Sequence, residues 1–221
     1  ILSLIPIGQP LLIKTGLFLS SSAILLSVSK NAYAGDASYY FDRAFDKAEK
    51  GDHYGAISDY TKAIEIDPKY SVAYFNRALS KYDMEDFYGA ISDNTKAIKI
   101  DPEYADAYYN RALAKEGIED YSGAIFDYTK TIEIDSKYAG AYNNRGILHV
   151  DLGDNYLAVS DFSKAIKYDA NNKLAYYNRG IAKSNLKDIN GAIADYTKAI
   201  EVDPEYADAY YNRGIEKFEL E

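Results

Sequence analysis

Cysteine and tryptophan are absent from this 221-residue sequence, and methionine occurs once, histidine twice and proline five times. Without cysteine the chain can form no disulfide, no thiolate metal site and no cysteine nucleophile. These absences remove several classes of metal site and catalytic site before any pattern is considered.

Basic residues are also fewer than acidic residues in this chain. The formal net charge is -9 and the pI is about 4.8, which disfavours nucleic acid as a partner because phosphates need a positive surface. Hydrophobic residues make up 48% of the chain, so the composition predicts a folded protein and not a disordered one. The aromatic residues include 24 tyrosines, whose apolar ring and polar tip suit half-buried positions and binding surfaces.

Residues 1–34 differ from the rest of the chain, with no acidic residue and only Lys14 and Lys30 as bases. An apolar core over residues 15–29 precedes a small-x-small site that ends at Ala34. This order predicts a secretory signal peptide cleaved after Ala34, and therefore a periplasmic or secreted protein. The alternative is an uncleaved membrane anchor, although the apolar core is shorter than the roughly 20 residues of a spanning helix.

The remainder of the chain repeats itself with a period of 34 residues and no insertion. A recurring arginine sets the register: Arg43, Arg77, Arg111, Arg145, Arg179 and Arg213. A second register, on alanine, agrees with it: Ala56, Ala90, Ala124, Ala158 and Ala192. A fixed period of this length indicates a solenoid of stacked units.

Each unit is predicted to form two helices. In unit 105–138 the apolar spacing predicts a first helix from Ala105 to Ile118 and a second helix that ends near Asp135. Asp120 stands where the second helix needs an N-cap acceptor. The same position is aspartate in the other full units: Asp52, Asp86, Asp154 and Asp188.

Small residues recur where the two helices of a unit should cross closely, because a large side chain there would push the helices apart. On the first helix they are Ala44, Ala78, Ala112, Gly146, Gly180 and Gly214, and on the second they are the recurring alanines.

The spacing resembles that of the tetratricopeptide repeat (TPR) family. Unit 173–206 matches the whole pattern with Tyr176, Gly180, Ala192, Tyr196, Ala199 and Pro204. The resemblance covers residues 37–221 of a predicted array at 35–221, as five full repeats (37–70, 71–104, 105–138, 139–172, 173–206) and a partial one (207–221). It implies an all-α fold, a right-handed superhelix (α-solenoid) of helix–turn–helix repeats whose first helices line a concave face.

The recurring arginine stands where the family usually has leucine, and each second helix carries an aspartate that could match it. We therefore predict structural ion pairs along the array. They join Arg77 with Asp93, Arg111 with Asp127, Arg145 with Asp161 and Arg179 with Asp195, with Asp59 in the equivalent place of the first unit.

The residues before each arginine are expected to face the concave surface, where asparagine amides can bond a peptide backbone and aromatic rings can add contact area. The predicted peptide-binding residues are Asn76, Asn110, Asn144, Asn178, Asn212, Phe75, Tyr109, Tyr177 and Tyr211. The alternative is that these side chains mainly support packing between repeats. Family members that grip a carboxylate terminus add basic inner residues, which are missing here at Asp106 and Leu174.

The function predicted from these features is a scaffold that binds a protein or an extended peptide in the groove. An enzyme is not expected, because no nucleophile–base set, phosphate loop or metal spacing is present, and no cofactor is implied. The two histidines, His53 and His149, occupy unrelated positions of the repeat. The alternative function is the recognition arm of a larger multidomain protein, since 207–221 copies an internal first helix. Membrane contact is expected only through an uncleaved leader, and the oligomeric state is left open.

Overall fold

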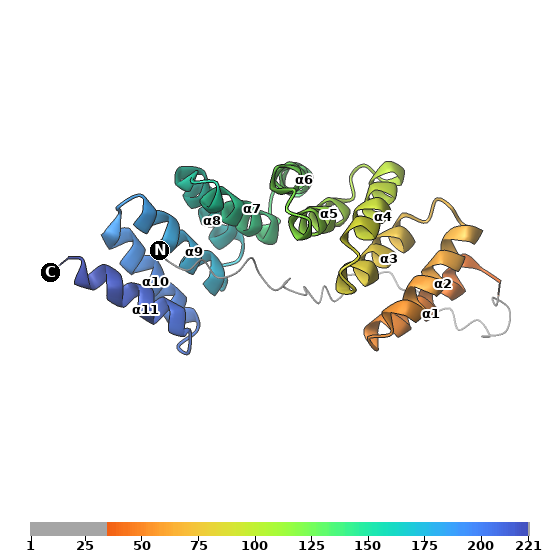
Figure 1. Ribbon diagram of the computed structural model, residues 1–221, viewed down its shortest axis with the longest axis horizontal. Helices are drawn as coiled ribbons and strands as arrows, with labels where there is room; N and C mark the ends of the chain where they lie inside the picture. Colours follow the sequence, from red (N-terminus) through yellow and green to blue (C-terminus); the bar gives the residue numbers. More distant parts are fainter. Residues whose placement is uncertain (1–34, 221) are drawn as a thin grey trace. The chain divides into compact units, whose positions relative to one another are not determined.

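The computed structural model describes residues 35–220, and these residues form eleven α-helices and no strand (Figure 1). The predicted signal peptide at 1–34 lies outside the described residues. Within the described part of the chain, no helix has the length and apolarity needed to cross a membrane. The helices are α1 (Ala37–Glu49), α2 (His53–Ile66), α3 (Ser71–Asp83), α4 (Phe87–Ile100), α5 (Ala105–Gly117), α6 (Tyr121–Ile134), α7 (Ala139–Asp151), α8 (Asn155–Tyr168), α9 (Lys173–Asn185), α10 (Ile189–Val202) and α11 (Ala207–Phe218).

The helices fall into two compact units that divide between Pro102 and Glu103. In both units each first helix packs against the second helix of its own repeat, and that second helix packs against the next first helix. First helices also touch one another, α1 with α3 and α7 with α9, so the first helices of neighbouring repeats share one side of the stack. The predicted all-α fold of helix–turn–helix solenoid repeats is confirmed.

Small residues allow the two helices of a repeat to approach closely, as predicted. A Cβ atom at Gly146 would lie 2.8 Å from Cε1 of Phe162, and one at Gly180 would lie 2.6 Å from Cε1 of Tyr196. Both rings are fully buried. In these two repeats the second-helix ring therefore lies directly on the backbone of the first helix, which is why glycine occupies the position.

The turn between the helices of a repeat depends on an aspartate and a glycine acting together. Asp120 caps α6 by accepting a hydrogen bond of 3.0 Å from the backbone N–H of Gly123, and a Cβ atom at Gly123 would lie only 2.1 Å from that carboxylate. The same pair caps α2, α4 and α10. At α8 the glycine position holds Leu157, and Asp154 makes no side-chain cap bond. Asp154 is still the N-cap residue of α8, as predicted, but the expected side-chain cap bond is absent, because the leucine side chain takes the place that the carboxylate needs.

Candidate functional site

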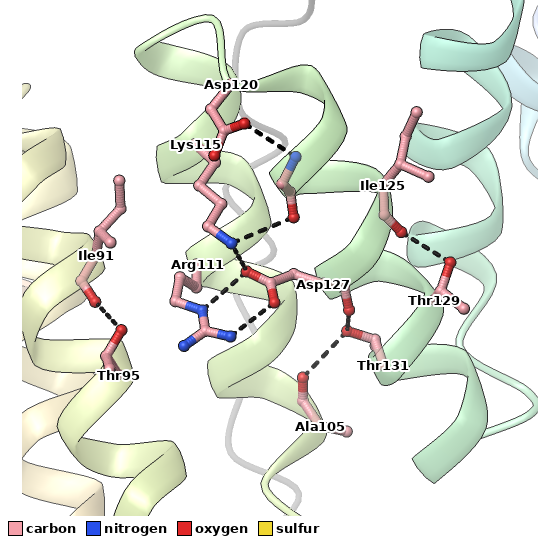
Figure 2. A network of polar contacts seen from close by, with 11 residues as sticks. Ile91, Thr95, Ala105, Arg111, Lys115, Asp120, Ile125, Asp127, Thr129 and Thr131 are labelled. Carbon is pink, nitrogen blue, oxygen red and sulfur yellow. Dashed lines mark hydrogen bonds and ion pairs between the residues drawn. The ribbon is translucent and has the colours of Figure 1, made fainter.

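A buried aspartate on each second helix is held by two basic residues of the first helix. The side chain of Asp127 is fully buried, and its two oxygens accept hydrogen bonds of 2.8 and 2.7 Å from Nε and Nη2 of Arg111 (Figure 2). Lys115, one turn further along α5, lies 2.8 Å from Oδ2 of Asp127 and also donates to the Gly123 carbonyl at 3.3 Å. The carboxylate therefore has a charge-assisted partner for each oxygen, which offsets the cost of its burial.

The other repeats contain the same arrangement. The remaining predicted pairs lie at N–O distances of 2.6 Å for Arg77–Asp93, 2.7 Å for Arg145–Asp161 and 2.7 Å for Arg179–Asp195. In the first repeat the hydrogen bonds from Arg43 lower the pKa of Asp59 to about 2. The fourth repeat departs from this pattern because His149 replaces the lysine. It lies 3.8 Å from Asp161, and burial lowers its pKa.

Three of these arginines also join neighbouring repeats. Nη1 of Arg77 donates a 2.9 Å hydrogen bond to the hydroxyl of Thr61, which itself donates to a carbonyl of α2. Arg77 thus connects α2, α3 and α4 through a single side chain. The equivalent bonds join Arg145 to Thr129 at 2.9 Å and Arg179 to Ser163 at 3.0 Å. This sequence-predicted set of ion pairs therefore lies at the junctions between helices, where it orders the stack.

Two of the five predicted peptide-binding asparagines bond to tyrosines of the preceding repeat. Nδ2 of Asn144 donates to the hydroxyl oxygens of Tyr109 at 3.0 Å and Tyr128 at 3.3 Å. Nδ2 of the buried Asn212 donates to the hydroxyl of Tyr177 at 2.9 Å. At these two places the asparagine supports packing between repeats, which is the alternative that the sequence left open.

The other three asparagines are placed differently. Asn76 donates to the Val72 carbonyl of its own helix at 2.8 Å. Among the described residues, the side chains of Asn110 and Asn178 make no hydrogen bond, and both are half-buried. Asn144 and Asn212 each bond to a tyrosine that lies 35 positions earlier in the chain. The residue 35 positions before Asn178 is Asn143, so Asn178 has no tyrosine partner. Asn143 is 7% exposed, and its Oδ1 has no hydrogen-bond partner.

The predicted aromatic residues divide in the same way. Tyr109 and Tyr177 are buried, each between two further tyrosine rings. Phe75 is half-buried, and Tyr211 is 70% exposed. The structure therefore brings Tyr109 together with Asn144 and Tyr177 together with Asn212. It leaves Tyr211 on the surface of α11.

A half-buried carboxyl group that the sequence did not point to lies beside this network. Glu116, on α5, accepts a hydrogen bond from the hydroxyl of Tyr128, which in turn accepts one from Asn144. Burial raises the pKa of Glu116 to about 7, and the nearby Asp151 contributes in the same direction. The equivalent residues of other repeats are not acidic (Val150 and Ser184, for example), so the repeat pattern gives no signal for this group.

The described residues contain no cluster of three or more histidine and carboxylate side chains that could hold a metal ion. The carboxylates with the most partners are those of the recurring ion pairs, whose oxygens are already bonded to arginine and, in four of the five full repeats, to lysine as well.

Comparison with known families gives the class of the protein. A tetratricopeptide repeat model matches residues 37–70, 105–138 and 139–172, and a second TPR model matches residues 185–216. These matches cover more than half of the chain, and it belongs to the tetratricopeptide repeat family. Sequence comparison with curated proteins finds no significant match.

Solved structures with the same fold include MamA and YrrB. A crystal structure of MamA has a TM-score of 0.70 and 26% identity over 77% of this chain and 93% of MamA. YrrB, described as a TPR protein with an unusual peptide-binding site, has a TM-score of 0.70 and 22% identity over 81% of this chain and 93% of YrrB. The first TPR of Spaghetti (RPAP3), bound to the HSP90 peptide SRMEEVD, has a TM-score of 0.53 and 25% identity over 53% of this chain and 94% of that one.

Arg179→Leu should destabilise the protein strongly, because it restores the usual family residue but leaves the buried Asp195 with Lys183 alone. We expect a loss of about 3–5 kcal/mol in urea unfolding followed by circular dichroism. The matched control is Arg213→Leu, which removes a single hydrogen bond to Thr197 and should cost about 1 kcal/mol. Equal losses in the two variants would show that the ion pair does not stabilise the stack.

Glu116 should make stability depend on pH near neutrality. Its pKa of about 7 in the folded chain exceeds the ordinary value of 4.5, so the folded state holds the proton more tightly than the unfolded state. This contribution is complete below pH 4.5 and is lost as the pH rises through 7. Glu116→Gln should therefore be more stable than the parent at pH 8 by roughly 1–3 kcal/mol, with no such gain at pH 4. The exposed Glu119→Gln is the control, and an E116Q gain that does not vary with pH would contradict the assignment.

Proposed function

We propose that this chain is a non-enzymatic interaction scaffold that binds a protein or an extended peptide along its first helices. The observation that carries the proposal is the state of Asn178 on α9. Its amide is half-buried and bonds to no described residue, although Asn144 and Asn212, at the same repeat position, are engaged by tyrosines. The free amide of Asn178 offers a partner's backbone both a donor and an acceptor.

The chemistry of the neighbouring positions limits the kind of peptide. The Spaghetti (RPAP3) repeat binds an acidic peptide, whereas the first helices here present Asp106 and Leu174 where basic residues would be needed. The carboxylate of Asp106 also accepts a 2.9 Å hydrogen bond from the hydroxyl of Tyr138. We therefore propose recognition of the peptide backbone, with apolar side chains of the partner on the helices. A nucleic acid is not proposed, because the chain carries a net charge of -9.

A crosslinking experiment tests this surface. Because the chain lacks cysteine, Asn178→Cys and Ser160→Cys each supply a single attachment point for a photoactivated crosslinker. Ser160 is exposed on α8 and serves as the matched control on a second helix. Incubated with fractions of the source cell, the label at position 178 should capture a specific protein that the label at 160 does not, because only the first should lie beside the bound partner. Identical adducts at both positions, or adducts at 160 alone, would place the contact elsewhere.

We also propose that the chain is exported, with residues 1–34 removed as a signal peptide; retention as a membrane anchor is the alternative. In support, α1 begins at Ala37 with Asp36 as its N-cap, so cleavage after Ala34 would leave the first repeat intact. The mature protein from its source should have an intact mass that begins at Gly35 and should fractionate outside the cytoplasm. A full-length chain in the membrane fraction would favour the anchor, and a full-length chain in the cytoplasm would overturn export.

A further inference from the structure

The turn between α7 and α8, in the fourth repeat, exposes three large hydrophobic side chains that lie close together in the sequence. Leu152 is 57% exposed, Tyr156 79% and Leu157 53%. In the third and fifth repeats the residues that correspond to Tyr156 and Leu157 are a small polar residue and a glycine. The counterparts of Leu152 in those repeats, Ile118 and Leu186, are half-buried. Hydrophobic surface gathered in this way is typical of an interaction site.

The backbone of this turn is built like that of the other turns. Gly153 has a φ of +84°, and Glu119, at the same place in the third repeat, has a φ of +62°. The backbone N–H of Asp154 donates a 2.7 Å hydrogen bond to the His149 carbonyl, which closes the turn. Only the side chains differ, and Leu157 removes the cap bond of α8. A residue that costs a helix its cap and adds hydrophobic surface does not serve the fold, which favours a functional role.

Both neighbouring repeats are in place around this turn. Helices α7 and α8 pack against each other, α6 lies against α7, and α9 lies against α8 (Figure 1). A continuation of the repeats at either end would pack on a terminal helix and would not cover the α7–α8 turn. The exposure of its hydrophobic side chains therefore does not depend on where the sequence begins or ends.

The charges at this turn are negative. Between residues 148 and 160 the sequence contains Asp151 and Asp154 and neither lysine nor arginine. Both aspartates are exposed, and neither forms an ion pair among the described residues. His149 lies 3.8 Å from Asp161 on the inner side of the repeat, and burial lowers its pKa. A partner that covers the hydrophobic side chains would thus meet two free carboxylates, which favour lysine or arginine on that partner.

We propose that the α7–α8 turn is a docking surface for an amphipathic, basic segment of a partner protein. Apolar side chains of the partner cover the three hydrophobic residues of the turn, and its lysines or arginines lie beside Asp151 and Asp154. A second copy of this chain is a poor occupant, because each copy carries a net charge of -9 and the two repel. The surface does not include Asn178 on α9, so this proposal and the peptide-binding proposal can fail independently.

Selection from a displayed library of random peptides tests the proposal without a known partner. The library is first passed over the immobilised full chain that carries Tyr156→Ser and Leu157→Gly, which gives the turn the residues of the third repeat at these positions. Peptides that do not bind this variant are then selected on the immobilised parent chain. The retained peptides should combine large apolar residues with lysine or arginine. Retained peptides without basic residues, or none at all, would overturn the proposal.

A selected peptide, synthesised with a fluorescent label, then locates the contact by anisotropy. Tyr156→Ser should weaken its binding about tenfold, because an anchoring ring is lost. Tyr88→Ser is the matched control, at the same place in the second repeat and 75% exposed, and it should bind the peptide like the parent. Equal weakening by the two variants would show that the peptide does not bind at the fourth repeat.

The two carboxylates are tested together. Asp151→Asn combined with Asp154→Asn should weaken the selected peptide about fivefold at low salt, since two exposed ion pairs are lost. The binding that remains should depend little on salt, because the charges that salt would screen are gone. An unchanged affinity would contradict the basic character assigned to the partner.

Leu157→Gly separates docking from folding. It should weaken the peptide while the midpoint of urea unfolding stays unchanged, because the regained Asp154 cap offsets the low helix propensity of glycine. A midpoint that falls together with the affinity would assign Leu157 to the fold and contradict the proposal. Sedimentation velocity of the chain alone gives another outcome. Self-association that Leu157→Gly abolishes would make a second copy the occupant and would overturn a distinct partner.

Discussion

The buried aspartate of each second helix is the constraint around which each repeat is built. A carboxylate in a protein interior is tolerated only when every oxygen is bonded to a cation or a donor, and Arg111 and Lys115 supply those bonds from the opposite helix of the pair. In Arg77, Arg145 and Arg179 the same guanidinium also reaches a hydroxyl of the preceding repeat. Correct pairing of one repeat thus fixes the neighbour, which gives the stack cooperativity beyond that of its apolar contacts.

Because the arginine of each repeat holds the buried aspartate, the asparagine that precedes the arginine is available for one of two roles. Where a tyrosine stands 35 residues earlier, as for Asn144, the amide is used to join repeats. Where that residue is Asn143, the amide of Asn178 stays free and the buried oxygen of Asn143 stays unbonded.

The sequence was sufficient for the helices and their pairing because both depend on short, repeated spacings. Arg179 and Asp195, for example, are 16 residues apart in one repeat and can meet only in one way. The roles of the asparagines were not predictable, since they depend on a side chain 35 residues away that changes from repeat to repeat. The structural effects of Leu157 and Glu116 were not predicted for the same reason. Each is a departure confined to one repeat, and its effect comes from a neighbour (the Asp154 cap or the Tyr128 hydroxyl) that only the folded structure identifies.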